Sequence, residues 1–199
     1  MTVPAPIAPA LGSRVPRRGN SFSRAVAVLA MRWSGWRFEG EFPNLPQFVV
    51  IVAPHTSNWD FLLGVMAMFA IGLRGTFLGK DTLFRWPARP VMRWLGGVPV
   101  DRSSPHHVVE QATAVFRQRE QLVLALSPEG TRKKLPEWRT GFWYVAKAAG
   151  VPIVPVAFDF SRRVFRIFPP VVPSESRERD FERLHGLFDA KMARHPERF

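Results

Sequence analysis

The chain has 199 residues, 46% of them hydrophobic, and a formal net charge of +12. Its length and apolar content exclude a largely disordered chain and favour one domain with a hydrophobic core. No cysteine is present, which excludes disulfides, thiolate metal sites and a cysteine nucleophile, and is typical of a reducing compartment. The positive charge favours a polyanionic partner, either nucleic acid or anionic lipids and phosphorylated substrates.

The abundance of tryptophan and phenylalanine beside arginine favours an anionic membrane surface over nucleic acid as the partner. A soluble basic protein with a Trp-rich core is the alternative. The longest nearly apolar run, residues 61–73, has thirteen residues, whereas a helix needs roughly 20 to cross a bilayer. The apolar stretch 25–31 is short and ends at Arg32, so we expect no secretory signal. The sequence therefore predicts a peripheral protein on the cytoplasmic face of the cell membrane.

The N-terminal region divides into two parts. Residues 1–19 are rich in proline and arginine and predict a flexible tail. Residues 20–37 combine apolar and aromatic side chains such as Phe22 and Trp33 with Arg24 and Arg32, which predicts a possible membrane-interface helix. An ordinary helix packed on the core fits the same periodicity. We expect residues 20–199 to form a single domain.

From residue 47 onward, strand and helix patterns alternate. Residues 48–53 (FVVIVA) and 122–126 (LVLAL) are continuous apolar runs, typical of strands buried on both faces. We predict further strands at 76–79, 98–100, 152–158 and 164–168, and helices at 57–73, 91–95, 105–120, 141–149 and 175–194. This order predicts an α/β fold: a single-domain sandwich with a largely parallel central sheet flanked by helices.

The first motif with chemical potential is HTSNWD, residues 55–60, directly after the first buried strand. Ligand and catalytic sites of open α/β sheets collect at the carboxyl ends of the strands. A carboxylate at Asp60, in the first turn of the next helix, can reach the imidazole of His55 and make it a general base. The alternative is structural: Ser57 and Asp60 would form a capping box, and His55 would be an ordinary loop residue.

The second motif is SPEGTRKK, residues 127–134, directly after the second buried strand. Gly130 permits close approach of the backbone, Thr131 offers a hydroxyl, and Arg132 offers a fork that matches phosphate. A Pro-Glu-Gly turn with solvated charges is the alternative. No group of residues has the spacing of a known metal motif, so we expect no metal.

Four blocks in a fixed order resemble the glycerolipid acyltransferase family, best known from bacterial 1-acyl-sn-glycerol-3-phosphate acyltransferases. They are HTSNWD (55–60), GKDTL (79–83) leading to WLGGVPVDR (94–102), PEGTR (128–132) and VPIVPVA (151–157). Ser127, where the family usually has phenylalanine, and Lys133-Lys134 depart from its pattern. These departures lie beside the second motif and put the identity of the acceptor in doubt.

The resemblance implies a function and its residues. His55 would be the catalytic base and Asp60 its orienter. Fatty acyl groups would pass from acyl-CoA or acyl carrier protein, as donor substrates, to a hydroxyl of a lysolipid acceptor in phospholipid biosynthesis, without a cofactor. The substrate-binding residues would be Lys80, Arg102, Glu129, Gly130, Thr131 and Arg132.

Two other functions remain open from the sequence. One is acylation of a different acceptor, such as a lyso-aminolipid. The other is a noncatalytic basic lipid-binding module. A serine hydrolase is disfavoured because the chain has no Gly-x-Ser-x-Gly elbow.

Overall fold

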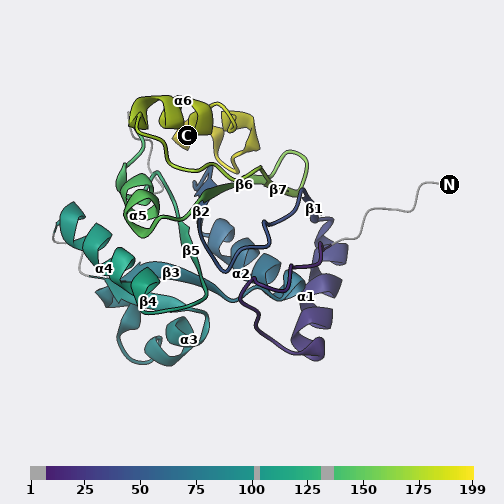
Figure 1. Ribbon diagram of the computed structural model, residues 1–199. Coiled ribbons are helices and arrows are strands. Elements are labelled where there is room, and N and C mark those ends of the chain that lie inside the picture. Colours follow the sequence, from purple (N-terminus) through teal and green to yellow (C-terminus); the bar gives the residue numbers. More distant parts are fainter. Residues whose placement is uncertain (1–7, 101–103, 131–136) are drawn as a thin grey trace.

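The computed structural model describes residues 8–100, 104–130 and 137–199 (Figure 1). These residues form one seven-stranded sheet with the strand order β1-β7-β6-β2-β5-β3-β4. The strands β6, β2, β5, β3 and β4 run parallel, β7 is antiparallel to β6, and β1 is parallel to β7. The predicted α/β fold with a largely parallel sheet is confirmed. The strands are β1 (Arg37–Glu39), β2 (Gln47–Ala53), β3 (Gly75–Lys80), β4 (Gly97–Val100), β5 (Leu122–Leu126), β6 (Ile153–Asp159) and β7 (Val164–Ile167).

Helices cover both faces of the sheet, as Figure 1 shows. Alternate residues of each central strand point to opposite faces, so the continuous apolar runs supply two cores. In β2, Phe48 and Val50 pack on the side of α1 and α2, whereas Val49 and Ile51 pack on the side of α4, α5 and α6. The helices are α1 (Ser21–Ser34), α2 (Trp59–Ile71), α3 (Arg89–Trp94), α4 (Pro105–Arg117), α5 (Gly141–Ala149) and α6 (Arg177–His185).

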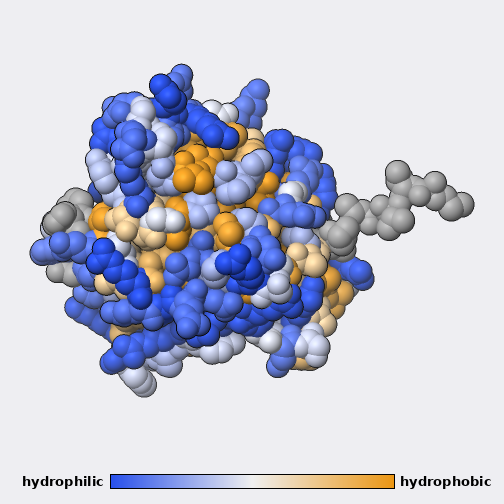
Figure 2. Space-filling view, viewed as in Figure 1, coloured by the Kyte–Doolittle hydropathy of each residue, from blue (hydrophilic) through white to orange (hydrophobic). Residues whose placement is uncertain are grey.

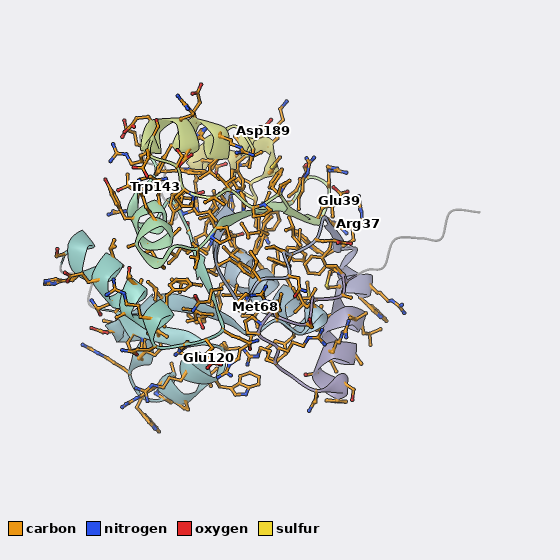
Figure 3. The ribbon with its side chains drawn as sticks, in the orientation of Figure 1. Arg37, Glu39, Met68, Glu120, Trp143 and Asp189 are labelled. Atoms are coloured by element: carbon orange, nitrogen blue, oxygen red, sulfur yellow. The ribbon has the colours of Figure 1, made fainter. Side chains whose placement is uncertain are left out.

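Two side chains labelled in Figure 3 mark the two cores. Met68 of α2 packs in the first core. Trp143 of α5 is buried in the second core, where its indole N–H donates to the Asp180 carboxylate over 2.8 Å and ties α5 to α6. Helix α3 belongs to the same side as α2, because the ring of Trp94 lies 5.4 Å from that of Phe69 in α2. Thus α1, α2 and α3 form one layer on the sheet.

Most predicted elements agree with the structure, and β5 and α5 begin and end at the predicted residues. Two predicted helices near the chain ends are present but shorter than predicted. The first helix ends at Ser34, where Gly35 adopts a left-handed φ of 74°, and the short strand β1 follows. The C-terminal helix ends at His185, and the 3₁₀ turns η2 (Ala190–Met192) and η3 (Pro196–Arg198) replace its predicted second half.

The predicted flexible tail over residues 1–19 does not hold for residues 8–19. Val15 is only 1% exposed and Leu11 is also buried in the first core. The guanidinium of Arg18 donates to the carbonyls of Trp94 and Leu95, so the segment is tied to the end of α3. Apolar burial and these bonds offset the entropy that a free tail would retain.

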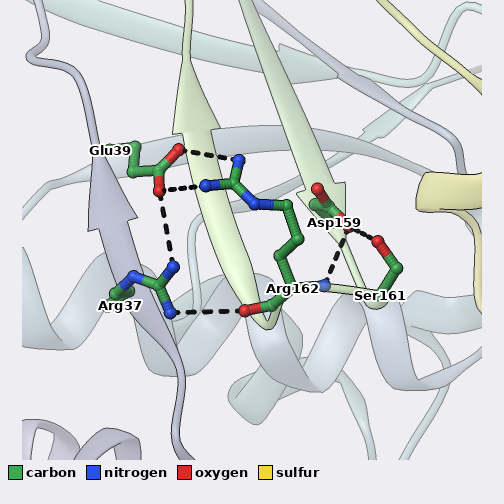
Figure 4. Close-up of polar contacts among 5 residues, drawn as sticks. All are labelled: Arg37, Glu39, Asp159, Ser161 and Arg162. Atoms are coloured by element: carbon green, nitrogen blue, oxygen red, sulfur yellow. Dashed lines mark hydrogen bonds and ion pairs between the residues drawn. The ribbon is translucent and has the colours of Figure 1, made fainter.

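An ion-paired cluster fastens β1 to the hairpin between β6 and β7 (Figure 4). Both carboxylate oxygens of Glu39 accept from the guanidinium of Arg162, at 2.8 and 3.1 Å. Asp159 holds the hairpin turn by accepting from the hydroxyl of Ser161 and the N–H of Arg162. These contacts place β1 at the edge of the sheet, beside β7.

In the described parts of the chain, every helix is too short or too polar to cross a membrane.

Candidate active site

The loops after β2 and β5 meet at one edge of the sheet. The two strands are neighbours, and the last paired residues are Ile51 and Leu126. The chain passes from β2 outward to β3 and β4, returns to β5 beside β2, and continues to β6 on the other side of β2. This reversal of direction creates the crevice in which open α/β sheets hold their ligands. His55 follows β2, and residues 127–130 follow β5.

His55 and Asp60 are in contact, as the sequence predicted. Nδ1 of His55 lies 3.2 Å from Oδ2 of Asp60. The Asp60 side chain is 1% exposed, whereas the His55 side chain is 26% exposed. A buried carboxylate therefore holds one nitrogen of a partly accessible imidazole, and the other nitrogen is left to exchange a proton.

Only part of the structural alternative is present, because the N-cap of α2 is Asn58 and makes no side-chain cap bond. Oδ2 of Asp60 accepts the backbone N–H of Ser57 over 2.8 Å, at the start of α2. Ser57 Oγ in turn accepts the N–H of Trp59 over 3.2 Å. One carboxylate oxygen thus binds the loop before α2 and also faces the imidazole.

Glu129 reaches the His55 loop from the other strand. Its Oε1 accepts the backbone N–H of His55 over 2.8 Å, and the residue is only 5% exposed. Burial raises the pKa of the Glu129 carboxyl, and the nearby Asp60 carboxylate raises it further, while the bond from the His55 N–H and the charge of His55 oppose this shift. The sequence placed Glu129 in the headgroup site, but the structure aims it at the HTSNWD loop.

Three oxygens of these loops are buried and have no hydrogen-bond partner among the described residues: Oδ1 of Asp60, Oγ of Ser127 and Oε2 of Glu129. Buried acceptors are normally satisfied by protein or by ordered water.

Gly130 is required by its conformation and by a neighbour. Its φ is +63°, in the left-handed region that favours glycine. A Cβ at this position would lie 2.6 Å from Cδ and 2.8 Å from Nε of Arg139. The exposed Arg139 also donates its backbone N–H to Pro128 over 2.7 Å. Arg139 was not predicted as a site residue, because its position seven residues beyond the PEGTR block gives no signal in the sequence.

The C-terminal segment braces the HTSNWD loop. This contact was not predicted from the sequence. Thr56 is fully buried, and its Oγ1 accepts the backbone N–H of His195 over 3.2 Å. Arg194 lies over the ring of Trp59, with its guanidinium carbon 5.0 Å from the ring centroid. His195 is half-buried and follows η2.

The structure describes only part of the predicted substrate-binding set. Glu129 and Gly130 lie in the crevice loop, and Lys80 is the last residue of β3. Arg102, Thr131 and Arg132 lie outside the described residues. Across residues 8–100, 104–130 and 137–199, no group of three or more His, Cys, Asp or Glu side chains is arranged to hold a metal ion.

Comparison with known proteins connects this geometry to a family. The family model described as Acyltransferase matches residues 38–159, from β1 to the end of β6. The 1-acyl-sn-glycerol-3-phosphate acyltransferase of Escherichia coli is 31% identical over 54% of this chain and 45% of its own length. The enzyme of the same name from Haemophilus influenzae is 28% identical over 54% of this chain and 46% of its own. The chain therefore spans about half the length of these curated relatives.

A solved structure shares the fold. The crystal structure of the 1-acyl-sn-glycerophosphate acyltransferase from Thermotoga maritima superposes with a TM-score of 0.63 at 20% identity, covering 83% of this chain and 75% of that one. The family match covers the two strands, both loops and the contact between His55 and Asp60. The chain belongs to the Acyltransferase family.

Proposed function

We propose that this protein is an O-acyltransferase that moves a fatty acyl group from an acyl thioester to a hydroxyl of a lysophospholipid such as 1-acyl-glycerol-3-phosphate, in phospholipid biosynthesis. The observation that carries the proposal is the 3.2 Å contact between Nδ1 of His55 and the buried carboxylate of Asp60 at the carboxyl edge of the sheet. The acceptor follows the names of the curated relatives. Acyl-CoA and acyl carrier protein both supply the required thioester.

In the proposed reaction, the second nitrogen of His55 removes the proton from the acceptor hydroxyl as its oxygen attacks the thioester carbonyl. Asp60 keeps the imidazole oriented and stabilises the imidazolium that forms. The tetrahedral oxyanion then collapses, the carbon–sulfur bond breaks, and the imidazolium returns the proton to the leaving thiolate. The chain has no cysteine, and this route needs no acyl-enzyme.

The remaining site residues take two roles in the proposal. Arg132, Lys80 and Arg102 would bind the acceptor phosphate together with Thr131 and the backbone at Gly130, and the exposed Arg139 adds positive charge beside Gly130. Glu129 would position His55 through its backbone rather than touch the headgroup, because its carboxylate is buried and bonded to that N–H.

We place the enzyme on the cytoplasmic face of the cell membrane, as a peripheral protein. The net charge of +12 supports an anionic lipid partner, and the acceptor itself resides in the membrane. A noncatalytic lipid-binding module is the second candidate, supported by the same charge.

The test is acyl transfer by His55→Ala. Purified protein is incubated with a labelled acyl thioester and a panel of lysolipids, and products are identified by mass spectrometry. Loss of the base should lower the transfer rate about 10²–10⁴-fold. His107→Ala, at an exposed position of α4, is the control and should retain the rate.

Near-normal transfer by a folded His55→Ala protein would refute the base assignment. A native protein that binds lipid but transfers no acyl group to any member of the panel would support the noncatalytic module instead.

A further inference from the structure

Exposed apolar side chains are concentrated on one side of the molecule. Twelve large hydrophobic residues are exposed in the described chain, and ten of them belong to α1, the start of α2 and the segment of residues 85–95 that contains α3. We name this set the apolar layer: Phe22, Val26, Leu29, Trp33, Trp59, Phe61, Leu62, Trp86, Val91 and Trp94. The face covered by α4, α5 and α6 carries only Tyr144 and Val172 of the twelve.

The α1 part of the apolar layer is a stripe on the side of the helix that faces away from the core. Its members, spaced four, three and four residues apart from Phe22 to Trp33, fall on one side of a helix. The buried residues Ala27 and Met31 lie on the opposite side. Core packing therefore does not explain the stripe, and Trp33 is 86% exposed. Figure 2 shows hydrophobic groups along its right-hand side, over α1.

The segment of residues 85–95 forms a second exposed group. Trp86 is 89% exposed, and Val91 and Trp94 are also exposed. The ring of Trp94 lies 5.4 Å from Phe69 of α2, and the guanidinium of Arg18 lies over both rings. These contacts join the second group to the layer of α1 and α2.

Basic residues flank both groups, and acidic residues are absent from their sequences. Arg24 and Arg32 are exposed on α1, and residues 20–37 contain no Asp or Glu. Arg85, Arg89 and Arg93 are exposed beside Trp86 and Trp94, and residues 82–100 contain no Asp or Glu. Tryptophan and arginine together match the interface of a bilayer that carries anionic lipids.

We propose that the apolar layer is a docking surface for an anionic phospholipid bilayer, and that residues 85–95 are a second anchor beside α1. Two separate groups fix the orientation of a protein on a plane, which a single helix cannot do. The four tryptophans of the layer are 52–89% exposed. On a bilayer these rings would contact lipid, whereas in water they leave a large apolar patch.

The orientation has a consequence for the site. Trp59, Phe61 and Leu62 belong to the layer and surround Asp60 in the sequence. Docking through α1, residues 85–95 and the start of α2 together would bring the HTSNWD loop to the lipid surface, where an acceptor hydroxyl lies. This use of the surface, to reach the acceptor, rests on the proposed function. Binding to vesicles does not, because it is measured without acyl transfer.

The experiment compares single substitutions in co-sedimentation with vesicles of phosphatidylcholine alone or mixed with phosphatidylglycerol. Trp33→Glu tests α1, Trp86→Glu tests the second anchor, and Val172→Glu, on an exposed residue outside the layer, is the matched control. Each tryptophan variant should weaken binding to the anionic vesicles about tenfold or more, because it removes buried aromatic area and adds a repelled charge. The control should bind as the native protein does.

Arg89→Gln should weaken binding to anionic vesicles about fivefold and leave binding to pure phosphatidylcholine unchanged. Normal binding by Trp86→Glu would overturn the second anchor, and equal loss in Val172→Glu would overturn the assignment to this surface. A native protein that dimerises in ultracentrifugation, and whose dimer is lost in Trp86→Glu while vesicle binding is kept, would assign the surface to a second copy of the chain.

Acyl transfer to a dispersed short-chain lysolipid separates this inference from the proposed function. Trp86→Glu should retain that rate, since the residue lies outside the site. Vesicle binding without any acyl transfer would refute the enzyme and leave the docking surface in place.

Discussion

Individual side chains at the edge of the sheet serve structure and chemistry together. Oδ2 of Asp60 accepts from Ser57 and faces His55, and Oε1 of Glu129 accepts from the backbone of His55. His55 is thus held through its ring by Asp60 and through its main chain by Glu129. Asp60 follows β2, and Glu129 lies in the loop after the neighbouring strand β5. Such support on both sides would limit the movement of the proposed base, whose efficiency depends on its distance from the substrate.

Glu129 yields a prediction about the pH dependence of stability. Its pKa is raised in the folded protein, mainly by burial, so the folded state holds this proton more tightly than the unfolded state does. The stability that this proton contributes is fully present below the unfolded pKa of 4.5. It is lost as the pH rises through the raised pKa of the folded protein. Glu129→Gln removes the buried charge and keeps an oxygen for the His55 N–H.

We therefore expect the unfolding free energy of Glu129→Gln, relative to the native protein, to increase between pH 5 and pH 7.5. Urea unfolding at the two pH values measures the difference. Glu120→Gln, on an exposed carboxylate labelled in Figure 3, should show no such trend. A relative stability of Glu129→Gln that falls as the pH rises would show that the carboxylate is favoured in its charged form.

At the scale of elements, the parts of the fold that the sequence predicts well are those with local causes. Strand β5 and helix α5 were placed to the residue, because an apolar run of five residues and the terminal Gly150 mark them without reference to the rest of the chain. The contact between His55 and Asp60 was predictable for the same reason, since only four residues of loop and helix start separate them.

The elements that were missed depend on distant partners. Strand β1 has three residues and exists because it pairs with Val164 and its neighbours, more than a hundred residues away. Glu129 bonds a backbone 74 residues before it. The bracing of Thr56 by His195 spans 139 residues. No pattern within a window of sequence carries such contacts. A longer first helix, a substrate-binding role for Glu129 and a long polar C-terminal helix were predicted in their place.

Helix α1 offers a matched pair of substitutions that separates packing from docking. Met31 is fully buried in the first core, whereas Leu29 is exposed on the stripe. Met31→Ala should lower the unfolding free energy by about 2–5 kcal/mol. Leu29→Ala should change it by less than about 0.5 kcal/mol and should weaken vesicle binding. Chemical denaturation and co-sedimentation measure the two effects. A large loss of stability in Leu29→Ala and a loss of vesicle binding in Met31→Ala would show that the helix is turned the other way.

At the scale of the whole molecule, the N-terminal segment is part of the fold. Residues 8–19 bury Leu11 and Val15 and are tied to the end of α3 through Arg18. A proline-rich composition had predicted a mobile tail, but proline also stabilises ordered extended segments, because fewer unfolded conformations are lost on folding. Composition alone does not distinguish these two cases.

Val15→Ala tests the role of this segment. The side chain is 1% exposed, so the loss of two methyl groups should lower the unfolding free energy by about 2 kcal/mol. Val172→Ala, the same change at an exposed position, should have almost no effect. Equal unfolding free energies for the two variants in urea would show that the segment is detached in solution.

The two open edges of the sheet have a consequence for association between molecules. Strand β1 is only three residues long, and its Arg37 and Glu39 side chains are engaged with Arg162 or its carbonyl. Strand β4 has four residues, and Pro99 within it has no N–H to donate. Neither edge is a good template for adding a strand from another chain, and short, charged or proline-containing edges are how native sheets resist aggregation. Crowding on a surface would therefore bring copies together without joining their sheets.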